Sequence, residues 1–150
     1  MQPELDDFNY ILERQLKPEA RRDVIEFLKK CEVIPTSMID ISDGLASEIF
    51  HICKSSNVGC QLYEEKIPID SQTYQTSMDF NINPTVSALN GGEDYELLFT
   101  ISQNDYEKIK NDPNITVIGH ITKKDQGINL IGNGNTSTPL QAQGWNHFNK

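Results

Sequence analysis

The 150-residue chain is poor in positive charge, and this deficit excludes several kinds of partner. It has 13 lysines and arginines against 22 aspartates and glutamates, which gives a formal net charge of -9 at neutral pH. The phosphates of nucleic acids and the surfaces of anionic membranes repel a protein with this balance, because like charges repel. We therefore expect neither a nucleic acid nor a membrane as a partner.

Long apolar runs are also missing. No stretch approaches the roughly 20 apolar residues that a membrane-spanning helix needs. The acidic segment of residues 1–10 lacks the basic and then apolar pattern of a secretory signal. We therefore expect a soluble, cytoplasmic protein.

Cysteine is scarce as well. Cys31, Cys53 and Cys60 are odd in number and form no Cys-x-x-Cys pair. This spacing favours small buried thiols in a reducing compartment over a zinc site or a disulfide. Cys53 supports that interpretation, because it falls on the same helical stripe as Leu45 and Ile49.

Apolar periodicity and turn residues predict an α+β domain. We expect helices at 18–31, at 45–56, at 84–89 and after a capping Ser102, and strands at 36–41, 60–64, 95–101, 115–121 and 127–131. Residues 71–84 predict a long surface loop or a short helix. Mixed spacing of this kind is typical of a layered domain in which a mixed β-sheet packs between helices.

Residues 39–45, IDISDGL, combine acidic side chains with a serine and a glycine. We expect Asp40 near the end of a strand and Asp43 at the start of a helix, where unpaired N–H groups suit phosphate oxygens. Two carboxylates at this spacing suit Mg²⁺, which prefers oxygen ligands and often shares its shell with phosphates. Gly44 allows a phosphate to approach the backbone closely, and Ser42 adds a hydroxyl donor.

A capped helix without any ligand is the alternative interpretation of the same residues. In that case Ser42 or Asp43 accepts backbone N–H groups of the first helical turn. The alternative leaves Asp40 unexplained, because a carboxylate inside an apolar strand needs a partner.

Residues 91–99, GGEDYELLF, form a second constellation. Two glycines permit an unusual turn, and strand alternation would send Glu93 and Tyr95 to one face and Asp94 and Glu96 to the other. One pair would then face a ligand. The alternative is a glycine turn that enters an edge strand, whose charges discourage aggregation.

Residues 144–148, GWNHF, contain the single tryptophan of the chain. Trp145 could stack on an aromatic ligand ring. The alternative is that it anchors the C-terminus to the core.

Together, residues 38–46 (MIDISDGLA), 88–100 (ALNGGEDYELLFT) and 144–148 resemble the thiamine-monophosphate kinases, with the motifs in the same order. Residues 12–18 resemble the segment that precedes them in that family. The resemblance extends only to the C-terminal domain, which is of the type shared with aminoimidazole ribonucleotide synthetase. We therefore expect a tail or linker remnant and run-in at 1–17 and a single C-terminal-type domain at 18–150.

The resemblance implies a role in thiamine diphosphate biosynthesis, with transfer of the γ-phosphoryl group of ATP to thiamine monophosphate. It implies that Asp40 and Asp43 bind Mg²⁺ and that Ser42 contacts ATP. It further implies that Glu93 and Trp145 contact the substrate. Nothing in the chain matches the family's N-terminal domain, which carries most of the nucleotide site, further magnesium ligands and the main dimer interface. We expect the full-length protein to be a homodimer and this chain alone to be inactive.

Two other functions stay open on the sequence. One is another ATP-dependent enzyme of the same superfamily, and the other is a non-catalytic domain that binds a metal or a ligand. Residues 93–96 and Trp145 favour the kinase.

Overall fold

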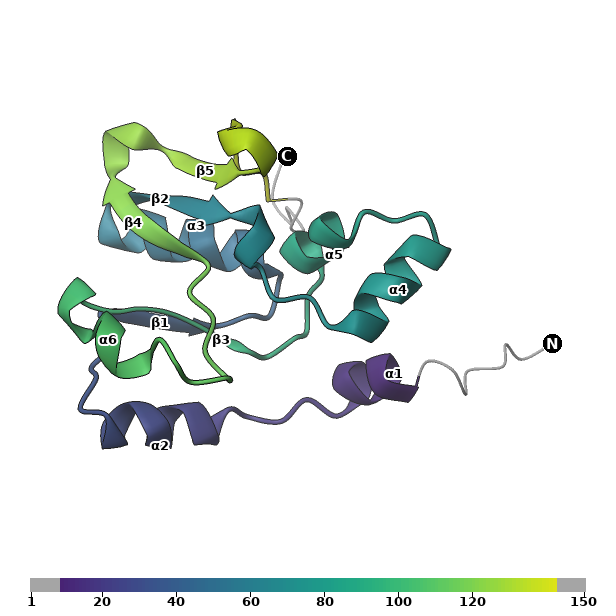
Figure 1. Cartoon of the computed structure of the whole chain (residues 1–150), viewed down its shortest axis with the longest axis horizontal. Coiled ribbons are helices and arrows are strands. Elements are labelled where there is room, and N and C mark those ends of the chain that lie inside the picture. Colours follow the sequence, from purple (N-terminus) through teal and green to yellow (C-terminus); the bar gives the residue numbers. More distant parts are fainter. Residues whose placement is uncertain (1–8, 143–150) are drawn as a thin grey trace, which may run out of the picture.

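The computed structural model describes residues 9–142, which form helices arranged around two separate β-sheets (Figure 1). The helices are α1 (Asn9–Leu16), α2 (Arg22–Lys30), α3 (Leu45–Ser56), α4 (Ser71–Asp79), α5 (Pro84–Asn90) and α6 (Tyr106–Ile109). The strands are β1 (Ser37–Asp40), β2 (Val58–Tyr63), β3 (Leu97–Thr100), β4 (Gly119–Lys123), β5 (Ile128–Ile131) and β6 (Ser137–Pro139). The predicted α+β class is confirmed.

The larger sheet is mixed. Its four strands lie in the order β4-β2-β5-β6, in which β2 and β5 are parallel and the other neighbours are antiparallel. The smaller sheet is an antiparallel pair of β1 and β3, with Ser37 opposite Thr100 and Asp40 opposite Leu97. Within the described residues, the strands therefore form two sheets instead of the single predicted sheet.

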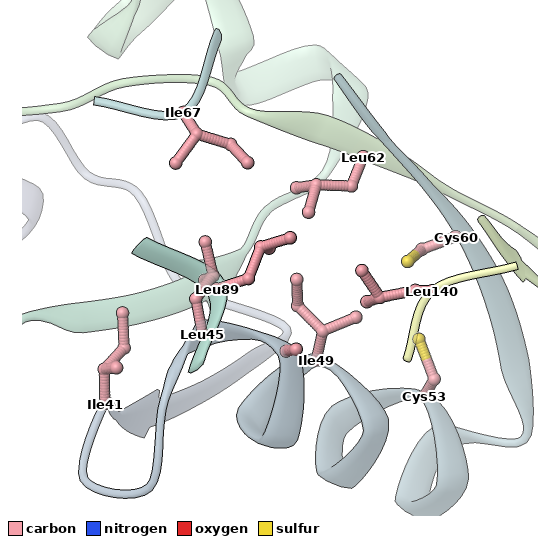
Figure 2. Close-up of a cluster of buried hydrophobic side chains, with 10 residues drawn as sticks. Ile41, Leu45, Ile49, Cys53, Cys60, Leu62, Ile67, Leu89 and Leu140 are labelled. Carbon is pink, nitrogen blue, oxygen red and sulfur yellow. The ribbon is translucent and has the colours of Figure 1, made fainter. Parts of the chain in front are cut away.

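The main core lies between α3 and the larger sheet (Figure 2). Leu45, Ile49 and Cys53 lie on one face of α3 and are buried, as their helical spacing predicts. They pack with Cys60 and Leu62 of β2. Burial of each large aliphatic side chain contributes about 1.5–3 kcal/mol, so this face fixes the orientation of α3 and of the turn that precedes it.

A second core covers the smaller sheet. Val24 and Leu28 of α2 and Ile109 of α6 are buried against it, together with partly buried Met38 and Phe99. Side chains alternate between the faces of a strand, so Leu98 points the other way and joins the main core. The β1–β3 pair thus lies between α2 and α6 on one side and the main core on the other.

All three cysteines are free thiols. Cys53 and Cys60 are buried in the main core, where Figure 2 shows them near Leu140. Burial is the main cause that raises the pKa of both thiols, that of Cys60 to about 12. The prediction of small buried thiols is confirmed for these two, whereas Cys31 is half-buried.

Several elements differ from those predicted. Residues 9–16, expected as part of a tail and run-in, form α1, which lies beside α4. Of the two possibilities left open for residues 71–84, the structure has the short helix, α4, and Asp70 caps it by accepting the Gln72 N–H at 2.8 Å. The strand expected at 115–121 begins only at Gly119. Within residues 9–142, none of the helices is long and apolar enough to cross a membrane.

Candidate functional site

Two loops that carry the sequence motifs meet at one end of the smaller sheet. We call residues 40–44 the acidic turn and residues 91–96 the glycine loop. The Ile41 N–H donates to the Glu96 carbonyl at 2.8 Å, and the Tyr95 N–H donates to the Ile41 carbonyl at 2.9 Å. The Glu93 N–H then donates to the Ser42 carbonyl at 2.8 Å. The β1–β3 pairing therefore continues into the loops and holds Glu93 beside the acidic turn.

Glycine is required where these backbones touch. A Cβ at Gly92 would lie 2.6 Å from the Ser42 carbonyl oxygen, which is too close for any side chain. Gly44 has a φ of 112°, and a Cβ there would lie 3.0 Å from the Leu89 carbonyl oxygen. Both glycines thus allow two backbone segments to approach more closely than other residues permit.

The two aspartates of the acidic turn are exposed. Asp40 is the last residue of β1, and Asp43 directly precedes the N-cap residue Gly44 of α3. Within the described part of the chain, neither carboxylate has a hydrogen bond or ion pair. Asp40 lies at the end of its strand, as expected, and is exposed there, so its carboxylate needs no partner from the protein.

The capped-helix interpretation of the acidic turn is also wrong. Gly44 occupies the N-cap of α3, and no side chain caps the helix there. Instead, the buried Glu48 accepts the Asp43 N–H at 3.2 Å and the Ser42 hydroxyl at 3.4 Å. Glu48 therefore holds the acidic turn from the protein interior and leaves the Asp43 carboxylate free to bind a ligand.

Sequence reasoning missed Glu48. Its side chain is only 2% exposed, which is unusual for a carboxylate. A signal was present, because Glu48 lies three residues after Leu45 and four before Ile52, on the buried stripe of α3. An acidic residue on an apolar stripe needs a donor, and the turn supplies two.

The exposed carboxylates of Asp40 and Asp43 suit a magnesium ion whose other ligands are water and phosphate oxygens. Among residues 9–142, no three His, Cys, Asp or Glu side chains are grouped to hold a metal. Mg²⁺ commonly takes only one or two protein carboxylates and fills its remaining positions with water and phosphate oxygens. The hard oxygen donors of Asp40 and Asp43 fit that partial role.

The glycine loop does not continue β3, so its predicted alternation is wrong. Glu93 has a φ of 64° and Tyr95 a φ of 51°, and β3 begins only at Leu97. An extended strand requires a negative φ at each residue. The side chains of the loop therefore do not alternate between two faces.

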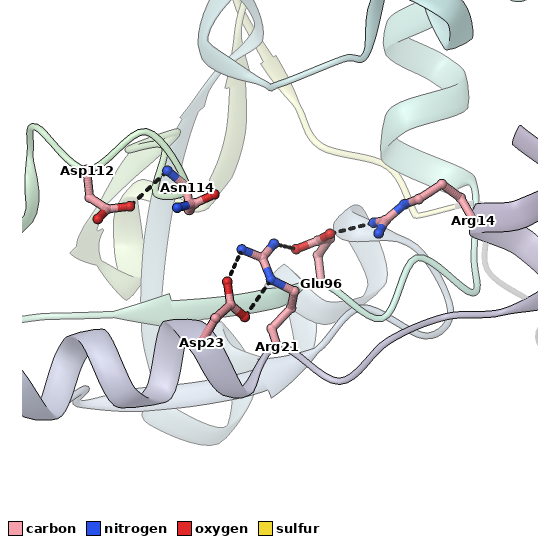
Figure 3. A network of polar contacts seen from close by, with 6 residues as sticks. All are labelled: Arg14, Arg21, Asp23, Glu96, Asp112 and Asn114. Atoms are coloured by element: carbon pink, nitrogen blue, oxygen red, sulfur yellow. Dashed lines mark hydrogen bonds and ion pairs between the residues drawn. The ribbon is translucent and has the colours of Figure 1, made fainter. Parts of the chain in front are cut away.

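Glu96, at the end of the glycine loop, is held by two arginines (Figure 3). One carboxylate oxygen accepts from Arg14 of α1 and the other from Arg21, which precedes α2. Arg21 also donates twice to Asp23, with both distances at 3.0 Å. The hydrogen bond to Asp23 is the main cause that raises the pKa of Arg21, and the same bond lowers the pKa of Asp23.

A cleft of about 1400 Å³ opens next to the glycine loop. Glu93, Asp94 and Glu96 line it together with apolar residues from both sheets, such as Leu98 of β3 and Leu62 of β2. Desolvation is the main cause that raises the pKa of Asp94; Glu96 acts in the same direction and Arg14 opposes it. The substrate-facing role predicted for Glu93 has a suitable space beside it.

The structure thus brings together four of the five predicted site residues, namely Asp40, Ser42, Asp43 and Glu93. Trp145 lies outside the described residues, and its role stays a prediction.

Comparison with known proteins first defines the class of fold. No family model matches the chain. A crystal structure of the Escherichia coli hydrogenase maturation protein HypE has a TM-score of 0.63 at 15% identity, over 83% of this chain and 40% of that one. At that identity the likeness concerns the fold alone. The chain is a layered α+β domain with an aminoimidazole ribonucleotide synthetase-like fold.

Proteins with higher sequence identity to this chain point to one family within this fold class. The thiamine-monophosphate kinase of Buchnera aphidicola subsp. Schizaphis graminum is 38% identical over 146 residues, which cover 93% of this chain and 43% of the kinase. The structure of AaThiL complexed with AMPPCP and TMP has a TM-score of 0.76 at 29% identity, covering 99% of this chain and 43% of that one. In sequence and in fold, this chain is similar to the C-terminal part of the thiamine-monophosphate kinases. It spans less than half the length of these relatives.

Proposed function

We propose that this chain is part of an enzyme that transfers the γ-phosphoryl group of ATP to thiamine monophosphate and forms thiamine diphosphate. One observation supports the proposal most: the backbone bond between Glu93 and Ser42 holds the expected substrate contact beside the expected metal ligands. Transfer between two anionic groups depends mainly on positioning and on neutralisation of charge. A site built from two interlocked loops suits that requirement.

In this proposal Asp40 and Asp43 hold Mg²⁺ through their exposed carboxylates. A bound magnesium ion supplies positive charge that offsets the repulsion between the phosphates of ATP and of the acceptor. Ser42 and the N-terminus of α3 face ATP, where backbone N–H groups and the helix dipole favour phosphate oxygens. Glu48 keeps Ser42 and Asp43 in place by accepting their hydrogen bonds.

Glu93 binds the acceptor in this proposal. The thiazolium ring of thiamine carries a positive charge, so a carboxylate beside it contributes attraction that is independent of the phosphate. Trp145 is proposed to lie beside the thiamine rings. The cleft lined by Glu93 offers room for a small ligand.

The remainder of the site is proposed to come from a segment that corresponds to the other half of the relatives. We propose that the complete enzyme is a cytoplasmic homodimer and that this chain alone gives no turnover. Phosphoryl transfer needs both substrates positioned together, and this chain spans 43% of the related kinases.

A chimera tests the proposal. This chain replaces the matching part of the Buchnera aphidicola kinase, whose identity of 38% favours a compatible contact between the two parts. With ATP, Mg²⁺ and thiamine monophosphate, we expect thiamine diphosphate, measured by chromatography, and none from this chain alone. A chimera that folds and binds ATP but forms no thiamine diphosphate would contradict the proposal.

A further inference from the structure

We propose that Glu96, held between Arg14 and Arg21, is a positioning residue that fixes the glycine loop and, through it, Glu93. The inference rests on the proposed function, because it takes Glu93 as the residue that contacts the acceptor. The ion-paired group of Arg14, Arg21, Asp23 and Glu96 is called the clamp below (Figure 3).

The clamp joins segments that are distant in sequence. Arg14 comes from α1, Arg21 precedes α2, and Glu96 ends the glycine loop, with separations of 82 and 75 residues between each arginine and Glu96. Each carboxylate oxygen of Glu96 is used by a different arginine. A carboxylate held at both oxygens has little freedom to rotate, so the end of the loop is fixed in place.

The clamp is better shielded than an ordinary surface ion pair. The side chain of Arg21 is 20% exposed and that of Glu96 is 34% exposed. Asp23 accepts two further bonds from Arg21 and so orients its guanidinium toward Glu96. Networks with this geometry contribute more than isolated exposed pairs, whose contribution is often negligible.

The glycine loop needs such support. Glu93 and Tyr95 both have a positive φ, a conformation that side-chain-bearing residues adopt only when their surroundings impose it. Backbone bonds to Ile41 and Ser42 restrain the loop from one side. The clamp restrains it from the other side, at the residue where the loop joins β3.

The clamp also separates the roles of the loop's acidic residues. Glu93 and Glu96 both line the cleft, but both carboxylate oxygens of Glu96 are already used by arginines. Removal of the arginine contacts would leave Asp94 and Glu96 to repel each other, because the charge of Glu96 acts to raise the pKa of Asp94. The loop would then relax, and Glu93 would move from its place beside Ser42.

Hydrogen exchange of this chain measures the loop directly. In Glu96→Gln one arginine faces the amide NH2 group, which cannot accept its hydrogen bond, and the other faces an uncharged carbonyl oxygen. We expect the backbone N–H groups of Glu93 and Tyr95 to exchange about tenfold faster, since bonds to charged groups are the stronger ones. The matched control is Glu107→Gln, which breaks the ion pair between Glu107 of α6 and Lys110, the residue after that helix, and leaves the loop amides unchanged. Unchanged exchange of the loop in Glu96→Gln would overturn the inference.

A milder variant covers the case in which Glu96→Gln unfolds. Arg14→Gln removes only the outer contact, from a side chain that is 42% exposed. Faster exchange confined to residues 91–96 supports the clamp, and unchanged exchange overturns it. Arg21→Lys keeps the positive charge but loses the guanidinium group that binds Glu96 and Asp23 at the same time. We therefore expect this variant to retain only part of the protection of the loop against exchange.

The chimera then tests the consequence for the acceptor. We expect Glu96→Gln to raise the KM for thiamine monophosphate about tenfold with a smaller change in kcat, because a displaced contact weakens binding of the acceptor. A loop that loosens without any change in KM would overturn the positioning role. If the unsubstituted chimera forms no thiamine diphosphate while exchange responds to Glu96, the clamp stands and the proposed function falls.

Discussion

The acidic turn and the glycine loop are both rich in carboxylates, but the protein treats these carboxylates in opposite ways. Asp40 and Asp43 are exposed and, within residues 9–142, have no side-chain partner. Glu96 is held by two arginines. The two loops nevertheless share a backbone contact, since the Glu93 N–H donates to the Ser42 carbonyl.

This difference separates binding from support. A carboxylate that already has two arginine partners has little to offer a cation, whereas one that faces water can exchange solvent for a ligand. The buried Glu48 holds the acidic turn in place, so Asp40 and Asp43 need not form ion pairs of their own and can bind a ligand. Four variants, given from the largest expected effect to the smallest, and a fifth that serves as a control test this division.

Asp43→Asn in the chimera removes one proposed magnesium ligand. We expect the rate of thiamine diphosphate formation to fall about a hundredfold, because charge stabilisation by a bound metal is worth several kcal/mol. The free energy of unfolding of this chain should change by less than about 0.5 kcal/mol, as for other exposed sites. Retained activity, or a large loss of stability measured by urea titration, would contradict the role of Asp43 as an exposed metal ligand.

Gly92→Ala tests the contact between the two loops. Its Cβ would lie 2.6 Å from the Ser42 carbonyl oxygen, so the loops must separate. We expect the free energy of unfolding to fall by about 1–3 kcal/mol, the usual cost of overpacking. The control is Gly132→Ala, whose nearest neighbour is the end of the flexible Glu64 side chain at 3.0 Å. Equal stability of the two variants in urea would argue against a close contact.

Glu93→Gln tests the charge of the residue in the glycine loop that we propose binds the acceptor. The variant keeps the shape of the side chain but removes its charge. We expect the KM for thiamine monophosphate in the chimera to rise about tenfold, as the loss of an interaction with a charged group predicts. Steady-state kinetics of the chimera measure this change, and an unaltered KM and kcat would remove Glu93 from the acceptor site.

Asp94→Asn should have the smallest effect, and its sign depends on pH. Desolvation raises the folded-state pKa of Asp94 above the ordinary 3.8, so its favourable contribution is present below that pH and is lost as the pH rises through the folded value. The neutral variant should therefore melt slightly higher than the parent chain at neutral pH and equally near about pH 3. Calorimetry at both pH values measures the difference.

Asp23→Asn is the control of opposite sign. Arg21 lowers the pKa of Asp23, so the stabilising contribution of this carboxylate is present above 3.8 and is lost as the pH falls through the lowered value. This variant should melt lower than the parent chain at neutral pH. A higher melting temperature for Asp23→Asn would contradict the role given to the clamp.

The elements with regular patterns could be predicted from the sequence. The stripe of Leu45, Ile49 and Cys53 predicts the buried face of α3, and the apolar run at 97–101 predicts β3. The division of the strands into two sheets was not predictable, because it depends on pairing between distant segments. The helix α4 was left open, since its sequence is polar and its cap, Asp70, gives only a local signal.

The site was predictable in its residues but not in its supports. The motifs identify Asp40, Asp43 and Glu93, and the β1–β3 register brings them together. The clamp was missed because its arginines lie 75 and 82 residues from Glu96, and no spacing rule joins such positions. Strand alternation also failed at residues 93–96, where hydrogen bonds to the acidic turn impose positive φ values.

The two buried thiols of the main core can report local unfolding of the chain. Cys53 lies on α3 and Cys60 on β2, and burial keeps both protonated at neutral pH. Alkylating reagents attack thiolates, so these sulfurs react only in states where the helix has left the sheet. The rate at which they are labelled, compared with that of the more accessible Cys31, therefore measures how often α3, the helix that follows the acidic turn, separates from the larger sheet.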